Sequence, residues 1–397
     1  MPLPGGDDTI YLDHAATTPV DPAVLEAMLP YFTRHFGNPS SIYQLGQEGR
    51  AALDRSRKSV AQILGCQPSE IVFTSGATES DNLALGGVAW QRRLSEPDSR
   101  PPHVITTAIE HHAVLHTAQW LERQGFPITY IPCDSAGFID PAAIEAAIRP
   151  ATCLISVMHA NNETGSIQPI AEIGQIARRQ GIPFHTDAVQ AAGILPLSVD
   201  DLNVDLLSLS AHKFYGPKGV GLLYVRRQTP IAFQQHGGGQ ESGRRGGTEN
   251  VAGVIGLAAA LELAEQTREE YKRHCAALRH RLWAGIQQSI PEVELNGTDE
   301  WSRRLSNNLN IAIPGVQGET MLLSLDMEGI AASAGSACTT GRSDPSHVLM
   351  ALGYGEERCR ASLRFSVGRG NTPDEIDDVV DALVEAVERV RQLSAVG

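Results

Sequence analysis

The sequence is short of cysteine and of long hydrophobic runs, and each shortage excludes a class of protein. Its six cysteines form no C-x-x-C pair, which excludes a small disulfide framework and a metal site of the usual zinc spacing. The longest weakly polar run, residues 251–261, is well below the roughly 20 apolar residues that cross a bilayer. The first residues have neither a basic flank nor an apolar core, so we expect no secretory signal, no membrane contact and a cytoplasmic location.

Basic residues are outnumbered as well. The formal net charge of -14 argues against a nucleic-acid partner, because binding to phosphate backbones depends on clustered Lys and Arg. The 397 residues with 42% hydrophobic content suffice for a large core, and this length suggests one large domain with a smaller companion.

Between residues 71 and 225, short β-rich runs alternate with helical segments. The runs are I-V-F-T, H-V-I-T-T, I-T-Y-I, C-L-I-S-V-M, I-P-F-H-T, D-L-L-S-L-S and V-G-L-L-Y-V. Such alternation predicts an α/β fold with a mostly parallel sheet and helices on both faces. Further helices are expected over 21–36, 43–64, 250–289 and 373–392.

Two residues at the ends of predicted strands suggest a pyridoxal phosphate site. Asp187 follows the run I-P-F-H-T, and Lys213 follows D-L-L-S-L-S. Ligands of parallel sheets bind at the carboxyl ends of the strands. A lysine that holds the cofactor as a Schiff base and an acid on its pyridinium nitrogen are what the protein contributes to this chemistry.

Two segments of small residues offer backbone N–H groups to a phosphate. Ser75–Ser80, S-G-A-T-E-S, follows a strand and opens a helix, where free N–H groups and the helix dipole stabilise an anion. Alone the segment is more often an ordinary helix cap, but the context of Asp187 and Lys213 favours a phosphate site. Gly237–Thr248 contains six glycines and either approaches a ligand closely or serves as a flexible connector.

Two further strand ends carry polar side chains. An imidazole of the pair His111 and His112 could stack on a flat cofactor and exchange protons. Because neighbouring strand residues point to opposite sides, we expect at most one of the two to face the site. In H-A-N-N-E-T-G, the amide of Asn162 could bind the cofactor, although Asn-Asn is also common in turns.

The segment S-A-G-S-A-C-T-T-G-R-S-D-P-S surrounds Cys338 with small residues. These predict an exposed thiol on a mobile loop, whereas the other five cysteines are expected to be inert. Downstream, Arg364 lies in a predicted strand and is either a clamp for a substrate carboxylate or an exposed strand residue.

Together these motifs make the chain resemble a cysteine desulfurase of the iron–sulfur cluster assembly type, in the class V aminotransferase group. The ordered markers are Y-L-D-H-A-A-T-T-P, G-N-P-S-S, S-G-A-T-E-S, N-N-E-T-G, D-A-V-Q, S-A-H-K, R-G-G-T and G-S-A-C-T. The resemblance implies pyridoxal phosphate fold type I, with a seven-stranded, mostly parallel sheet in a large domain. We expect this domain over residues 20–265 and a smaller α+β domain over 1–19 and 266–397.

The resemblance also implies a role for each matching residue. Lys213 would hold the cofactor, Asp187 would bind its ring nitrogen, and His111 would stack on the ring. Asn162 and Gln190 would hydrogen-bond it. The phosphate would be bound by Ala77, Thr78, Ser210 and His212, and by Thr248 of a neighbouring subunit in a homodimer. Arg364 and Asn38 would bind the substrate carboxylate.

The implied reaction converts L-cysteine to L-alanine. The freed Lys213 amine moves the proton of the substrate Cα, and the Cys338 thiolate accepts the sulfur as a persulfide for an iron–sulfur scaffold or another acceptor. One alternative keeps the cofactor but changes the reaction, to a selenocysteine lyase, a cystine lyase or a plain aminotransferase. Another is a catalytically silent sulfur-transfer scaffold.

Overall fold

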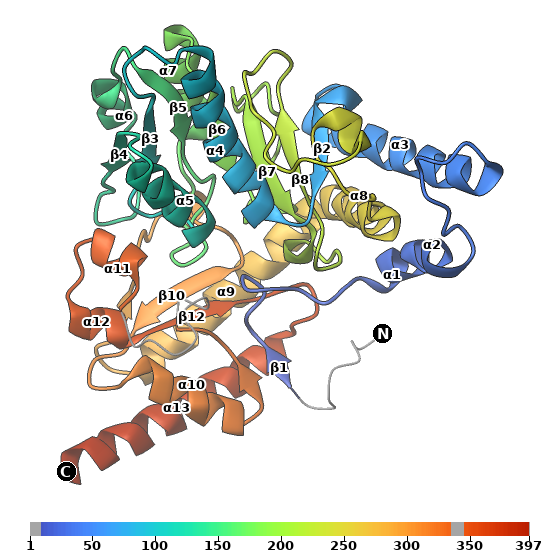
Figure 1. The fold of residues 1–397 in the computed structure, drawn as a ribbon. Helices are drawn as coiled ribbons and strands as arrows, with labels where there is room; N and C mark the ends of the chain where they lie inside the picture. The colour runs from blue at the N-terminus through green and yellow to red at the C-terminus, as the bar shows by residue number, and fades with distance from the viewer. Residues whose placement is uncertain (1–8, 335–344, 397) are drawn as a thin grey trace.

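A computed structural model describes residues 9–334 and 345–396 of the chain, with side chains described up to residue 392. Its centre is a seven-stranded sheet with the strand order β2-β8-β7-β6-β5-β3-β4 (Figure 1). The strands are β2 Ile71–Thr74, β3 His103–Thr107, β4 Ile128–Ile131, β5 Thr152–Ser156, β6 Phe184–Asp187, β7 Leu206–Ser210 and β8 Gly221–Val225. Only β8 runs antiparallel to its two neighbours, so the prediction of a mostly parallel α/β sheet is confirmed.

Alternate residues of these strands enter two different cores. Phe73 and Tyr224 pack on one side of the sheet, and their neighbours Val72 and Leu223 pack on the other. The first side is covered by helices that include α3 Gln44–Leu64, α6 Pro141–Ala147, α7 Ile170–Gln180 and α8 Val251–Gln266, and the second by α4 Ala77–Ser95 and α5 His112–Arg123. The sheet is therefore buried on both faces, as parallel sheets are.

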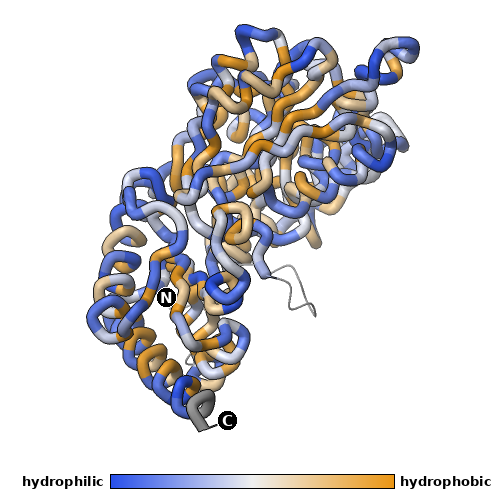
Figure 2. The backbone as a smooth tube through the Cα atoms, turned by 90° about the vertical axis from the view of Figure 1, so that its left-hand side faces the viewer, coloured by the Kyte–Doolittle hydropathy of each residue, from blue (hydrophilic) through white to orange (hydrophobic). Residues whose placement is uncertain are grey.

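A separate hydrophobic core lies below this sheet in Figure 1. It packs helices against a three-stranded antiparallel sheet and also includes Leu12 from the start of the chain. Its elements are α9 Arg268–Ser289, β9 Glu294–Leu295, β10 Asn308–Ala312, α10 Gly318–Met327, β12 Ser362–Ser366 and α13 Pro373–Val396. The hydropathy of α13 alternates along the helix that ends at C in Figure 2, as expected of a helix with one buried face.

The start of the chain joins this lower part. Strand β1, Ile10–Tyr11, pairs in parallel with β11, Ile330–Ala331. Short helices complete the description: α1 Pro22–Met28, α2 Pro30–Thr33, α11 His347–Ala351 and α12 Glu356–Arg360. The domain boundaries expected from the sequence stay a prediction.

Two helices expected from the sequence are broken in the structure. The helix expected over 21–36 is divided by Pro30, which starts α2, since proline interrupts the helical hydrogen bonds. The segment over 250–289 divides into α8 and α9 at Thr267, whose backbone leaves the helical region with φ -102° and ψ 5°. The helix over 43–64 ends as expected, at Gly65 in the left-handed conformation with φ 71°.

Candidate active site

The structure places ten of the predicted site residues around one cavity of about 510 Å³. This volume is in the range of small-molecule sites. The ten residues are Ala77, Thr78, His111, Asn162, Asp187, Gln190, Ser210, His212, Lys213 and Arg364. They come from separate strand ends and helix starts, so the fold brings together residues that are far apart in the sequence.

Lys213 ends a single 3-10 turn, Ala211–Lys213, directly after β7. Its Nζ donates to the backbone carbonyls of Ala15 at 2.6 Å and Ala16 at 2.8 Å. Gln190 donates to the same Ala15 carbonyl at 3.0 Å. The segment after β1 thus fixes the position of the amine at the cavity wall.

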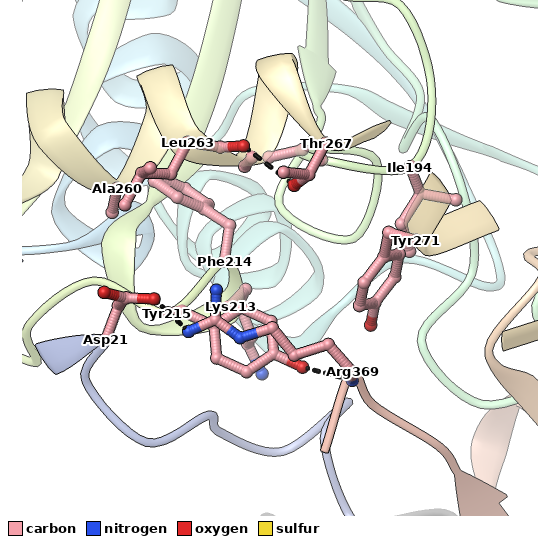
Figure 3. A pocket seen from close by; sticks show the side chains of 13 residues that line it. Asp21, Ile194, Lys213, Phe214, Tyr215, Ala260, Leu263, Thr267, Tyr271 and Arg369 are labelled. Carbon is pink, nitrogen blue, oxygen red and sulfur yellow. Dashed lines mark hydrogen bonds and ion pairs between the residues drawn. The ribbon is translucent and has the colours of Figure 1, made fainter. Parts of the chain in front are cut away.

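On its other side Lys213 lines a second, much smaller cavity of about 30 Å³ (Figure 3). There the Arg369 side chain is paired with Asp21 and lies over the ring of Tyr215, 3.9 Å from its centroid. Tyr271 and Thr267 close the far wall. The space is far smaller than the large cavity, so the large cavity is the wider approach to Lys213.

Asp187 is the last residue of β6 and is 5% exposed. Its Oδ1 accepts the backbone N–H of Val189 at 3.0 Å. Burial raises the pKa of Asp187 to about 6, against the opposing effects of this hydrogen bond and of Lys213. At neutral pH the carboxyl is therefore mostly ionised, and a nearby cation would lower its pKa again, as expected of an acid that partners a protonated ring nitrogen.

A buried polar layer lies behind Asp187, on the face of the sheet that α4 covers. His185 is hydrogen-bonded to the hydroxyls of Ser156 at 2.8 Å and Ser208 at 3.0 Å, and its Nε2 is 3.5 Å from Oδ1 of Asp81. Burial, followed by the charge of Asp187, raises the pKa of Asp81 well above its usual value. The sequence carried a signal for this layer, because His185 and Asp187 are two residues apart in a strand and so share a face.

His111 caps the N-terminus of α5. Its Nδ1 accepts the backbone N–H of Ala113 at 3.1 Å, so the neutral ring carries its proton on Nε2. Burial, with a smaller effect from Lys213, lowers the pKa of His111 to about 4. The ring is therefore neutral at pH 7 and can donate one hydrogen bond through Nε2.

The expectation that at most one of the two histidines faces the site is wrong. Both His111 and His112 line the cavity. The strand alternation used to exclude one of them does not apply, because β3 ends at Thr107 and His112 already begins α5. His347 also lines the cavity, with its ring 4.7 Å from that of His112.

The first turn of α4 presents unpaired backbone N–H groups to the cavity. Its cap residue is Gly76, which has no side chain to satisfy them, and Ala77 and Thr78 follow it. A Cβ added at Gly76 would lie 3.8 Å from the hydroxyl of Ser210, so this turn and the end of β7 are adjacent. The arrangement provides donors of the kind that bind phosphate.

Arg364 lies in β12 and is 1% exposed, so the interpretation as an exposed strand residue is wrong. Its Nη2 is 2.8 Å from the Asp13 carboxylate, and its Nη1 donates to the backbone carbonyl of Asn162 at 2.9 Å. The guanidinium is thus held in a fixed direction at the cavity wall. This geometry suits the two-pronged binding of a carboxylate.

Two of the predicted residues that the structure describes, Thr248 and Asn38, do not line the cavity. Cys338 lies outside the described residues. Thr248 is exposed and does not line this cavity, and its predicted role is on the phosphate of a neighbouring subunit. Asn38 is exposed and accepts the backbone N–H of Ser40 at 2.9 Å.

The other five cysteines are unreactive by their surroundings. Burial raises the pKa of each thiol, and for Cys66, Cys153 and Cys275 the value is about 12. A thiol is nucleophilic only as the thiolate. Among the described residues, no group of three or more His, Cys, Asp or Glu side chains is placed to hold a metal ion, and no helix is long and apolar enough to cross a membrane.

Comparison with known proteins agrees with this geometry. Residues 10–379 match the family described as Aminotransferase class-V. The chain belongs to the class-V aminotransferase family. Among the similar proteins, "Cysteine desulfurase IscS" of Clostridium botulinum is 49% identical over 97% of this chain and 96% of that protein. "Cysteine desulfurase IscS" of Methanosarcina thermophila is 50% identical over 97% of this chain and 93% of that protein.

Solved structures of related proteins have the same fold. One described as "NIFS-LIKE PROTEIN" superposes with a TM-score of 0.89 at 37% identity, covering 96% of this chain and 100% of its own. Another, "SspA in complex with cysteine", has a TM-score of 0.77 at 39% identity and covers 91% and 99%. The large sheet and its helices are therefore those of a class-V aminotransferase of pyridoxal phosphate fold type I.

Sequence reasoning missed several residues of the site. Asp13, Glu163, His347 and Lys218 either line the cavity or hold a residue that does. Glu163 is buried, and its carboxylate accepts the Ser346 hydroxyl at 2.5 Å. The sequence contained a signal for Glu163, because it directly follows Asn162, a predicted site residue. His347 had none, because only the tertiary fold places α11 beside α5.

Proposed function

We propose that this protein is a pyridoxal phosphate-dependent cysteine desulfurase, which converts L-cysteine to L-alanine and takes the sulfur onto Cys338. The observation that carries the proposal is the single cavity that combines a lysine, a buried acid, a phosphate-type helix start and a fixed arginine. Similarity over nearly the whole chain to proteins named cysteine desulfurase supports it.

The residues around the cavity fit the cofactor. Lys213 supplies the amine for its aldehyde, Asp187 would hold the proton at the ring nitrogen, and N–H groups of Ala77 and Thr78 would bind its phosphate. His111 would lie against the ring with Nε2–H as a donor. When bound, pyridoxal phosphate withdraws electrons from the substrate Cα and so makes its proton and its β-sulfur transferable.

Three of the chain's own residues would then each perform a task. Arg364 binds the substrate carboxylate and orients the amino acid. Lys213 moves the Cα proton. Its amine is in position for this because the carbonyls of Ala15 and Ala16 hold it at the cavity wall. Cys338, as thiolate, forms an S–S bond with the substrate sulfur while the C–S bond breaks. The electron pair of the broken C–S bond stays with the substrate Cβ, which takes up a proton, so that L-alanine is released and Cys338 is left as a persulfide.

We also propose a homodimer. Seven large hydrophobic side chains are exposed between residues 25 and 45, an unusual concentration for a monomer surface. They are Leu25, Leu29, Phe32, Phe36, Ile42, Tyr43 and Leu45, and we call them the apolar patch. A second copy would bury this patch and could supply Thr248 to the phosphate. We place the protein in the cytoplasm, with an iron–sulfur scaffold or another acceptor protein receiving the sulfur.

One experiment tests the reaction. The purified protein is incubated briefly with L-cysteine, alanine is quantified, and the peptide containing Cys338 is weighed by mass spectrometry. We expect alanine formation and the mass of one added sulfur on that peptide. Lys213→Ala should abolish the visible absorbance band and both products, and Cys338→Ser should abolish sulfur release but keep the band.

Cys66→Ser serves as the matched control, because its thiol is held protonated by burial and should leave both products unchanged. Undiminished sulfur release from Cys338→Ser would mean that the persulfide step is wrong and would favour a lyase. A wild-type protein with no absorbance band and no alanine would contradict the enzyme itself and favour a silent scaffold.

A further inference from the structure

An acidic side chain lies where a phosphate is expected to bind. Glu79 is in the first turn of α4 and lines the large cavity beside Ala77 and Thr78. Its side chain is 21% exposed. A carboxylate next to a phosphate is repulsive, so a phosphate can bind here only if the protein balances the charge of Glu79.

Two groups of donors hold the Glu79 carboxylate. Ser75 donates its backbone N–H at 2.8 Å and its hydroxyl at 2.5 Å to Oε2. Arg245 binds both oxygens, with Nε 2.9 Å from Oε1 and Nη2 3.3 Å from Oε2. Burial alone would raise the pKa of Glu79, but the hydrogen bonds from Arg245 and Ser75 outweigh it and keep the pKa below its usual value. Glu79 is therefore ionised at neutral pH, and Arg245 supplies the compensating charge.

The loop that carries Arg245 is fixed to the large sheet. Glu241, 6% exposed, accepts two hydrogen bonds from Arg57 at 2.6 and 2.9 Å and the backbone N–H of Phe73 at 3.1 Å. Arg244 donates to the backbone carbonyl of Ser69, just before β2, at 2.8 Å and to that of Ile71, the first residue of β2, at 2.9 Å. The glycine-rich segment is thus pinned in the structure, and the interpretation as a flexible connector is not needed.

This pinning holds a strained backbone. Glu241 and Ser242 have positive φ angles of 47° and 59°, which non-glycine residues adopt only when their surroundings impose them. The ion pair with Arg57 anchors the side chain of Glu241, the first of these two residues. Three residues after Ser242, the loop delivers Arg245 to Glu79.

We propose that Arg245 neutralises Glu79 so that the first turn of α4 can bind the phosphate of the cofactor, and that the Glu241–Arg57 pair positions Arg245 for this task. The inference rests on the proposed function, because it assumes that pyridoxal phosphate is the ligand. Arg245 acts through Glu79 and is a positioning residue, not a catalytic one.

The test compares the binding of pyridoxal phosphate with that of pyridoxal, which lacks the phosphate. The full-length protein is stripped of cofactor and titrated with each compound, and binding is followed by absorbance and tryptophan fluorescence. In Arg245→Gln we expect the Kd for pyridoxal phosphate to rise about tenfold or more, and the Kd for pyridoxal to stay unchanged. The double variant Glu79→Gln/Arg245→Gln should return close to the wild-type Kd.

Glu79→Gln alone keeps the shape of the site and removes the repulsive charge, so it should bind pyridoxal phosphate at least as tightly as wild type. Arg92→Gln is the matched control, since Arg92 pairs with Glu96 at 2.9 Å at the other end of α4 and should change neither Kd.

Several outcomes would overturn the inference. Arg245→Gln with an unchanged Kd, or with equal losses for both compounds, would contradict the role of Arg245. A double variant as weak as Arg245→Gln would mean that Arg245 contacts the phosphate itself, and a weaker Glu79→Gln would show that the carboxylate assists binding. Failure of the wild-type protein to bind either compound would overturn the proposed function, and the inference with it.

Discussion

At the scale of single residues, burial sets the protonation states in this site. His111 is neutral because burial and Lys213 lower its pKa to about 4, and its cap contact with Ala113 fixes the position of its proton. Asp187 is held in the opposite sense, with a pKa raised to about 6 by burial. At neutral pH the cavity is therefore lined by a neutral histidine that can donate a hydrogen bond and by a carboxylate that is mostly ionised.

Glu110 provides a pH test of this burial. Its Oε1 accepts the Thr107 hydroxyl at 2.7 Å and the Met158 N–H at 3.0 Å, and burial raises its pKa to about 8. A raised pKa of an acid adds stability that is complete below the unfolded value of 4.5 and is lost as the pH rises through about 8. Glu110→Gln keeps the acceptor without the charge, so its free energy of unfolding should fall less than that of wild type between pH 5 and pH 8.5.

The free energy of unfolding is measured by urea unfolding at several pH values. In the wild type, Glu110 alone can change this free energy by at most about 1.4 kcal/mol per pH unit. Parallel pH profiles for the two proteins would show that Glu110 does not titrate in this range.

Arg364 provides a kinetic test. A lysine keeps the positive charge but loses the two-pronged geometry and the contacts to Asp13 and Asn162. We expect Arg364→Lys to raise KM for L-cysteine about tenfold or more, as measured by steady-state alanine formation. The absorbance band of the cofactor should stay unchanged. Arg389→Lys, at an exposed ion pair on α13, should match wild type. An unchanged KM in Arg364→Lys would exclude Arg364 as the carboxylate clamp.

At the scale of elements, the site depends on how strand ends meet helix starts. A Cβ added at Gly221 in β8 would lie 2.7 Å from the backbone of Gly76 and 2.6 Å from the Leu209 carbonyl. Since backbone atoms cannot yield without moving their strand or helix, a side chain here must displace the start of α4.

Gly221→Ala should therefore destabilise the protein by about 1–3 kcal/mol and weaken the binding of pyridoxal phosphate. Both effects can be measured by thermal unfolding and cofactor titration. Gly355→Ala is the control, because the added Cβ would meet open space and the backbone φ is an ordinary -70°. If the two variants behave alike, the contact between β8 and α4 does not limit the phosphate site.

Helices and strands could be predicted from the sequence where a local pattern of residues determines them. All seven strands of the large sheet follow from β-rich runs, and Asp187 and Lys213 follow from their places after two of them. Other features depend on tertiary context. The break between α8 and α9 carries no proline or glycine, and the pairing of Glu79 with Arg245 joins residues 166 positions apart, so no local signal points to either.

At the scale of the whole molecule, the apolar patch predicts the assembly. Phe36 and Ile42 are 66% and 90% exposed, and a second copy would remove them from water. Phe36→Glu combined with Ile42→Glu should shift the sedimentation of the protein from dimer to monomer and weaken pyridoxal phosphate binding through the loss of Thr248. Leu94→Glu, at another exposed position (68%), should leave the mass unchanged. A dimer that persists in the double variant would place the interface elsewhere.

The path of the first described residues has a consequence for the order of events during synthesis. Leu12 lies between partners near the other end of the chain: its N–H donates to Ala331 O at 2.8 Å, and its carbonyl accepts from Ser366 N at 2.7 Å. The segment that holds the Lys213 amine is therefore anchored on its N-terminal side only after residue 366 has emerged from the ribosome. The large sheet can form early, but a finished cofactor pocket is among the last features of the nascent chain. Capture of the cofactor is thus expected at or after release, and a chain that stops before β12 should leave the ribosome with a folded sheet and an incomplete cofactor pocket.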